Sequence, residues 1–234
     1  MTLPLWVILP AAGVGRRMGS AIPKQYLDLA GRAVIDYALD LFVADARIAG
    51  IVVALDPVDG YWDATAYADH PKVTRAAGGA ERCHSVLNAL ALLAERADEQ
   101  DWVLVHDAAR PCLRAADLDR LIETLLDDPV GGLLGIPVRD TMKRDDDAGR
   151  IASTVDRSSL WHAYTPQMFR LGLLRQALHD ALAANDLVTD DASAIERLGH
   201  APRLIEGHAD NLKITRAEDL PLARFYLEQQ RRAR

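Results

Sequence analysis

The sequence has few cysteines, no long hydrophobic run and no excess of positive charge. Two cysteines, Cys83 and Cys112, are too few for a disulfide framework and form no zinc motif, so we expect reduced thiols in a cytoplasmic protein. No stretch reaches the roughly 18 apolar residues of a membrane span, so no membrane partner is expected. The formal net charge of −7 argues against a general nucleic-acid-binding protein. A small polyanionic ligand is still compatible, because it requires only local positive charge.

Familiar catalytic signatures are also missing. The chain has no H-E-x-x-H motif, no catalytic triad signature and no G-x-x-x-x-G-K-[ST] phosphate loop. The apolar run at 5–9 precedes Arg16 and Arg17, whereas a secretory signal places its positive charges first. The run therefore predicts a first β-strand.

The spacing of apolar residues predicts a parallel α/β sheet. The 234 residues suit one large α/β domain or two small ones, and we expect one domain over 1–234. Apolar segments of strand length alternate with segments of helical periodicity. We expect strands at 5–9, 50–55, 102–105 and 132–138, and helices at 33–43, 81–97 and 116–126. Strands that are apolar throughout and separated by helices indicate a sheet covered on both faces.

The pattern changes at about residue 138. The segment 138–156 is polar, and a turn signal at 145–149 separates two short strand patterns, which predicts a projecting β-hairpin arm. A lone hairpin is only marginally stable, so we expect it to pack on a second copy of the chain; a loose surface loop is the alternative. Further helices are expected at 172–184, 190–198 and 216–230, a strand at 203–206 and a strand-like run at 211–215.

A glycine-rich turn follows the first strand, and three cations lie close to it. Gly13 and Gly15 allow close approach of the backbone to phosphate oxygens, and Arg16, Arg17 and Lys24 supply positive charge. A dinucleotide-binding fingerprint fits poorly, because Gly19 comes one residue late. The acidic residue at the end of the second predicted strand, Asp56, follows the glycines by about forty residues, whereas the fingerprint requires about twenty. The cluster therefore favours a nucleoside triphosphate, although each cation alone could be a surface charge.

Two further segments follow predicted strands or precede helices. Asp107 comes directly after the strand at 102–105, where ligands bind in open α/β sheets, and a carboxylate there suits Mg²⁺. Gly78 and Gly79 precede a helix whose first turn contains Ser85, so backbone amides could meet a base or a phosphate. Taken alone, Asp107 could equally cap a turn, and the glycines could form an ordinary turn.

In this order, the motifs resemble those of the 2-C-methyl-D-erythritol 4-phosphate cytidylyltransferase family. They are Pro10-Ala11-Ala12-Gly13-x-Gly15-Arg16-Arg17-Met18, Pro23-Lys24-Gln25-Tyr26, Gly78-Gly79-x-x-Arg82-x-x-Ser85-Val86, Val105-His106-Asp107-Ala108-Ala109-Arg110-Pro111, Pro137-Val138-x-Asp140-Thr141, Asp156-Arg157, Thr165-Pro166-Gln167, Thr189-Asp190 and Asn211-x-Lys213-x-Thr215. Each motif alone is weak, but the ordered set covers almost the whole chain.

The resemblance implies a three-layer, Rossmann-like α/β nucleotidyltransferase domain with a mostly parallel sheet and a β-hairpin dimerisation arm. It implies CTP and methylerythritol 4-phosphate as substrates, a divalent cation such as Mg²⁺ as cofactor, and a homodimer. The catalytic residues would be Arg17 and Lys24. The nucleotide would contact Ala11, Ala12, Gly13, Gly15, Gly79, Ala80 and Ser85. The sugar phosphate would contact Asp107, which is also the metal ligand, and Ala108, Arg110, Thr141, Arg157, Thr165, Thr189 and Lys213. Ala80 departs from the aspartate found in some members, with little consequence if the contact is made by backbone.

The chemistry is consistent with this assignment without a general base. A sugar-phosphate oxygen is already ionised at pH 7, so catalysis consists mainly of positioning and charge stabilisation. Three alternatives remain open at this stage. They are a cytidylyltransferase for another polyol phosphate such as ribitol 5-phosphate, a nicotinamide-dependent oxidoreductase, and a non-catalytic nucleotide-sensing module.

Overall fold

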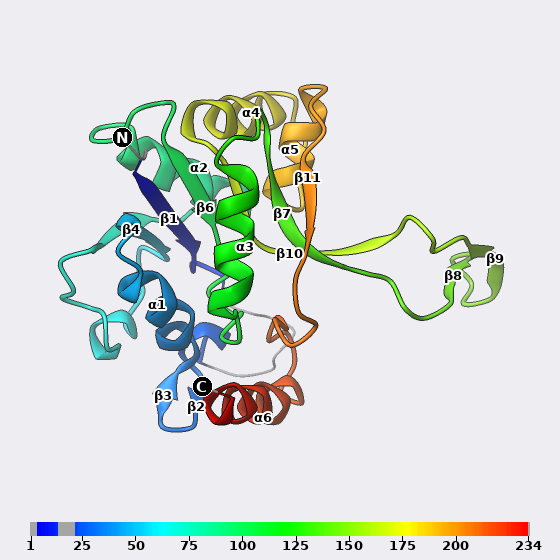
Figure 1. Cartoon of the computed structure of the whole chain (residues 1–234), viewed down its shortest axis with the longest axis horizontal. Coiled ribbons are helices and arrows are strands. Elements are labelled where there is room, and N and C mark those ends of the chain that lie inside the picture. The colour runs from blue at the N-terminus through cyan, green and yellow to red at the C-terminus, as the bar shows by residue number, and fades with distance from the viewer. Residues whose placement is uncertain (1–3, 14–21, 234) are drawn as a thin grey trace.

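A seven-stranded sheet forms the centre of the computed structural model, which describes residues 4–13 and 22–233 (Figure 1). The strand order is β11-β7-β10-β6-β1-β4-β5. The strands are β1 (Leu5–Pro10), β4 (Ile48–Leu55), β5 (Val73–Ala77), β6 (Trp102–Val105), β7 (Gly131–Pro137), β10 (Trp161–Arg170) and β11 (Arg203–Glu206). Strand β10 runs antiparallel to β6 and β7, and every other pair in this sheet is parallel. The expected mostly parallel sheet is confirmed.

Helices cover both faces of the sheet and make three layers. Helices α1 (Val34–Ala44) and α3 (Ala115–Leu125) lie on one face (Figure 1). Helices α2 (Arg82–Leu93), α4 (Leu171–Ala183) and α5 (Asp191–Arg197) lie on the other. Each face has its own buried apolar cluster, because alternate side chains of the inner strands point to opposite sides. Helix α6 (Asp219–Arg232) packs at one end through a third, smaller cluster.

The register of the central strands brings three loops to one edge. Val7 of β1 is paired with both Ile51 of β4 and Leu104 of β6, and all three strands are almost completely buried. Parallel strands in register end at the same edge of the sheet. The segments after β1, β5 and β6 therefore lie together, and they carry the glycine turns and Asp107.

Two strands of the central sheet were not predicted from the sequence. Strand β5 at the sheet edge alternates half-buried and exposed residues and has a weak apolar signal. Strand β10 begins with four exposed or half-buried residues and is buried only from Thr165 onward, so its sequence lacks a continuous apolar run. The prediction of a strand-like run at 211–215 is wrong, because this segment is not in a sheet. Its Ile214 N donates to Ala109 O at 2.8 Å.

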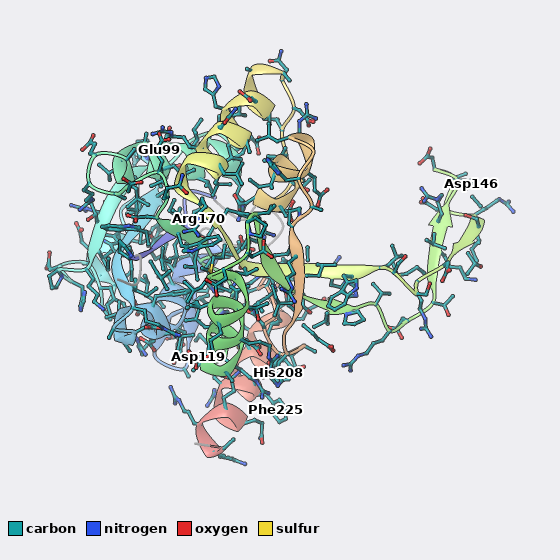
Figure 2. The ribbon with its side chains drawn as sticks, turned by 45° about the horizontal axis from the view of Figure 1, so that its top comes forward. Glu99, Asp119, Asp146, Arg170, His208 and Phe225 are labelled. Carbon is teal, nitrogen blue, oxygen red and sulfur yellow. The ribbon has the colours of Figure 1, made fainter. Side chains whose placement is uncertain are left out.

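The predicted hairpin is present and projects far from the sheet (Figure 1). It consists of β8 (Met142–Asp145) and β9 (Ile151–Val155), with Asp146 at its tip (Figure 2). The Asp146 carboxylate accepts from the backbone N–H groups of Ala148 and Arg150, and this closes the turn. The arm is exposed along nearly all of its length, and Ile151 is 67% exposed. The loose-loop alternative is therefore wrong, whereas the dimerisation role stays a prediction.

Short elements complete the described chain. They are η2 (Lys24–Tyr26), β2 (Asp28–Leu29), β3 (Arg32–Ala33) and η3 (Trp62–Ala64).

Candidate active site

The three loops at the carboxyl edge enclose a pocket of about 270 Å³. Its lining residues are Pro10, Ala11, Ala12, Gly13, Lys24, Gln25, Gly79, Ala80, Glu81, Arg82, Ser85, Asp107, Ala108, Ala109 and Lys213. They come from five separate parts of the chain, so the fold brings together motifs that lie far apart in the sequence. Of these, Gln25, Glu81, Arg82, Pro10 and Ala109 were not predicted as site residues.

The Asp107 carboxylate contacts three cationic side chains in this pocket. Its Oδ1 accepts from Arg82 Nε at 3.2 Å. Its Oδ2 lies 2.9 Å from Lys213 Nζ and 3.3 Å from Arg110 Nε. The three cations come from α2, from the loop after β6 and from the segment before α6. A buried carboxylate with several cationic partners is held firmly in place, because each partner restricts its rotation.

The charge state of Asp107 follows from these neighbours. Burial alone would raise the pKa of its carboxyl group. The positive charges of Arg82, Lys213 and Arg110 outweigh burial and hold this pKa well below its usual range. Asp107 is therefore ionised at neutral pH, which a metal ligand requires.

The glycine turn before α2 is shaped by close contacts. A Cβ at Gly78 would lie 2.2 Å from the Ala12 Cβ, and one at Gly79 would lie 2.3 Å from the His84 Cβ. The two glycines therefore permit an approach between loops that no larger residue allows. The Ser85 hydroxyl accepts from Gly79 N–H at 3.0 Å and donates to Glu81 O at 3.2 Å. In this structure Ser85 holds the turn in shape.

The short helix η2 carries Lys24 to the pocket. The adjacent Gln25 is only 3% exposed, and its Nε2 donates to Ala11 O at 2.6 Å. This bond ties η2 to the loop after β1, so Lys24 reaches the same pocket as Ala11 and Gly13. The available sequence signal for this contact was the motif Pro23-Lys24-Gln25-Tyr26.

A buried network behind Asp107 fixes the backbone of the site. The Thr165 Oγ1 accepts from Asp107 N at 3.1 Å and lies 3.0 Å from His106 Nδ1, while His106 Nε2 lies 3.1 Å from Arg110 O. Since a carbonyl can only accept, Nε2 carries the proton and Nδ1 accepts from the Thr165 hydroxyl. His106 is therefore the neutral imidazole. Burial, as the main cause, lowers its pKa to about 4.

Acid is expected to destabilise the fold through His106. Between its ordinary pKa of 6.5 and about 4, the unfolded chain binds this proton and the folded chain does not, so stability falls as the pH falls through this range. The full difference corresponds to about 3 kcal/mol. Urea unfolding from pH 7.5 to 4.5 should show a shallower pH dependence for His106→Gln, which cannot titrate. Equal slopes for the two proteins would contradict this account.

The structure brings together most of the predicted site residues that it describes. Ala11, Ala12, Gly13, Lys24, Gly79, Ala80, Ser85, Asp107, Ala108 and Lys213 line the pocket. Arg110 and Thr165 lie directly behind it through Asp107. Gly15 and Arg17 lie outside the described residues.

Three other predicted residues neither line this pocket nor bond to Asp107. Thr141 and Arg157 are exposed at the base of the arm, next to β8 and β9. Thr189 lines a separate surface hollow together with Val188 and Ser193. Their predicted role in sugar-phosphate binding is untested within one copy of the chain.

The donor set suits a metal that also binds phosphate. Within residues 4–13 and 22–233, no group of three or more His, Cys, Asp or Glu side chains could hold a metal by itself. Mg²⁺ commonly takes one or two carboxylates together with substrate phosphates and water. Among the described residues, Asp107 Oδ1 accepts only from Arg82 Nε, and an ionised carboxylate oxygen has two lone pairs. Asp107 therefore fits a metal shared with a triphosphate.

Comparison with known proteins agrees with this site. The family described as 2-C-methyl-D-erythritol 4-phosphate cytidylyltransferase matches residues 5–229. The chain is 57% identical over 221 residues to the Pseudomonas putida (strain GB-1) enzyme of that name, covering 94% of each chain. It is 59% identical over 216 residues to the Pseudomonas aeruginosa PAO1 enzyme, covering 92% of each.

Solved structures give the same result. The structure of a 4-diphosphocytidyl-2C-methyl-D-erythritol synthase matches with a TM-score of 0.84 and 40% identity, covering 97% of this chain and 99% of that one. The Francisella tularensis cytidylyltransferase matches with a TM-score of 0.82 and 36% identity, over 95% and 99%. Among the described helices, none combines the length and apolar character needed to cross a bilayer. With this sequence match, sheet order and pocket, the chain belongs to the 2-C-methyl-D-erythritol 4-phosphate cytidylyltransferase family, enzymes that transfer the cytidylyl group of CTP.

Proposed function

We propose that the pocket around Asp107 is where this chain carries out its family's reaction, transfer of CMP from CTP to 2-C-methyl-D-erythritol 4-phosphate. The observation that supports this most strongly is the meeting of Lys24, Lys213 and Asp107 beside two glycine turns in one pocket. The turns suit a triphosphate because backbone N–H groups and cations bind phosphate oxygens. The reaction needs no general base, because the phosphate nucleophile is already ionised.

In the proposed reaction, different cationic side chains bind the two anionic reactants. An oxygen of the acceptor phosphate attacks the α-phosphorus of CTP, the bond from the α-phosphorus to the bridging oxygen breaks, and pyrophosphate leaves. Lys24 and Arg17 stabilise the charge that develops on the α-phosphate. Lys213 lies beside Asp107 and is 35% exposed, so it can bind the acceptor phosphate. Arg110, which is almost fully buried, positions Asp107.

A divalent cation, in our proposal Mg²⁺, would be held by Asp107 and triphosphate oxygens. It would offset the repulsion between the two reactants. The nucleotide contact assigned to Ala80 would be made by its backbone, so the alanine at position 80 is compatible with CTP binding. The Gly79 N–H donates to Ser85 in this structure.

The arm is proposed to form a homodimer and to carry Thr141 and Arg157 to the partner's pocket. Its apolar side chains support this, because Ile151 is 67% exposed and Met142 is 36% exposed on a hairpin with no core of its own. Ile151→Asp is expected to lower self-association at micromolar concentration without unfolding the sheet, and activity should fall with it.

Sedimentation velocity and turnover on the same samples check this expectation. Val58→Asp is the control, because Val58 is 89% exposed and lies outside the arm. A wild-type chain that is monomeric and fully active would contradict the proposed role of the arm.

The substrates are tested by a pyrophosphate-release assay that pairs each nucleoside triphosphate with each acceptor. We expect release only with CTP and 2-C-methyl-D-erythritol 4-phosphate. Release that prefers ribitol 5-phosphate would identify a different acceptor. CTP binding without release would identify a nucleotide-sensing module.

A further inference from the structure

A second buried carboxylate lies behind the pocket and has no assigned role. Asp191 is the first residue of α5, is 0% exposed and does not line the pocket. Its Oδ2 accepts from Arg82 Nη2 at 2.7 Å, and its Oδ1 is buried with no hydrogen-bond partner among the described atoms. Burying a charge with an unsatisfied oxygen costs free energy. Helix capping does not explain the residue, because the adjacent Asp190 caps α5.

Arg82 connects this carboxylate to the active site. Its Nη2 contacts Asp191, and its Nε contacts Asp107 Oδ1 at 3.2 Å, so one guanidinium bridges both. The planar fork of arginine can serve two carboxylates in fixed directions, whereas a lysine ammonium is a single point charge. The orientation of Arg82, and through it that of Asp107, therefore depends on Asp191.

The framework behind Asp191 is rigid and shared with Asp107. The Gln167 side chain, 1% exposed on β10, accepts from Ala192 N at 2.7 Å and donates to Asp190 Oδ2 at 2.9 Å. Two residues earlier on the same strand, Thr165 accepts from Asp107 N. Side chains of β10 thus hold the backbone beside both carboxylates, and the Arg82 guanidinium lies between the two.

Asp107 needs such support because one of its other partners, Lys213, faces the substrate. Lys213 lines the pocket, and an acceptor phosphate would draw it away from Asp107 Oδ2. Asp107 would then be held by Arg82 at Oδ1 and by the buried Arg110 at Oδ2. We propose that Asp191 is a positioning residue: it holds Arg82 against Asp107, so that Asp107 keeps its orientation while anionic substrates bind. This inference rests on the proposed function, because it takes the pocket around Asp107 to be the reaction site.

The test compares two carboxylates in the same assay of pyrophosphate release from CTP and 2-C-methyl-D-erythritol 4-phosphate. Asp191→Asn should lower kcat by about tenfold to a hundredfold, the usual effect of losing a group that orients a functional side chain. Asp186→Asn removes a charge from the loop before α5; the Asp186 side chain is 46% exposed, pairs with Arg197 and contacts neither Arg82 nor Gln167. It should change kcat by no more than about threefold. Equal losses in both variants would overturn the proposal.

A double variant shows whether Asp191 acts through Arg82. Arg82→Lys cannot bridge both carboxylates, so it should lose about as much activity as Asp191→Asn. The kcat of the combined variant should be no lower than that of the less active single variant, because both changes break the same connection. Losses that multiply in the combined variant would show independent roles and overturn the proposal.

Asp191→Glu separates positioning from packing. The extra methylene strains a fully buried position, so a merely structural residue would tolerate Glu less well than Asn. A residue that orients Arg82 by charge should retain more activity as Glu. Asn outperforming Glu in kcat would contradict the proposal. Wild-type activity with the two substrates tests the proposed function itself, so the two failures are distinguishable.

Discussion

Asp107→Asn is expected to lower kcat about a thousandfold, near the upper end of the loss seen when one preorganised charge-stabilising group is removed. Asparagine retains the shape but not the charge. The cations Arg82, Lys213 and Arg110 would then repel one another, and Asp107 would no longer be available to a metal. Because the partners of a buried charge are left uncompensated, the free energy of unfolding should also fall, by about 3 kcal/mol.

Steady-state kinetics on samples shown to be folded by circular dichroism checks this result. Asp119→Asn is the matched control (Figure 2): Asp119 pairs with Arg47 at 2.5 Å, but its side chain is 50% exposed on α3, away from the pocket. An Asp107→Asn enzyme within threefold of the control would exclude a central role for this carboxylate.

Lys24→Ala is expected to lower kcat by roughly a hundredfold to a thousandfold with a smaller change in the KM for CTP. This split follows if Lys24 binds the α-phosphate more strongly in the transition state than in the ground state. Arg17→Ala should give the same pattern, on the basis of the sequence motif alone.

The measurement is a full kinetic analysis of Lys24→Ala, Lys24→Arg and Arg75→Ala. Lys24→Arg keeps the charge and should recover part of the activity. Arg75 forms a surface pair with Asp63 and is 60% exposed, so its loss should have little effect. If Lys24→Ala raised KM while leaving kcat unchanged, Lys24 would bind ground state and transition state equally.

Much of this fold could be predicted from periodicity, because the central strands are buried on both faces. The strand at 102–105 coincides with β6, and the strand at 203–206 coincides with β11. Strand β10 was missed because its first half pairs only with β7 and is exposed or half-buried. The burial of β10 depends on β6 and β7, which are far away in the sequence, so no local pattern predicts this strand.

The site likewise contains residues that a local motif predicts and residues that only contacts between distant segments define. Residues on the glycine turns and Asp107 were predictable, since the carboxyl ends of parallel strands meet at one edge. Arg82 lay within a recognised motif but had no assigned role, because its two partners are 25 and 109 residues away. The network of Thr165, His106 and Arg110 likewise depends on contacts between distant segments. Spacing along the chain cannot show such contacts.

The most direct test of the account is to follow labelled oxygen from the acceptor phosphate by ³¹P NMR. With ¹⁸O in the phosphate of 2-C-methyl-D-erythritol 4-phosphate, attack on the α-phosphorus of CTP predicts a labelled oxygen bridging the two phosphorus atoms of the product, and unlabelled pyrophosphate. The Asp107→Asn enzyme should form this product about a thousandfold more slowly. Label in the released pyrophosphate, or a product without a labelled bridge, would contradict cytidylyl transfer at this site.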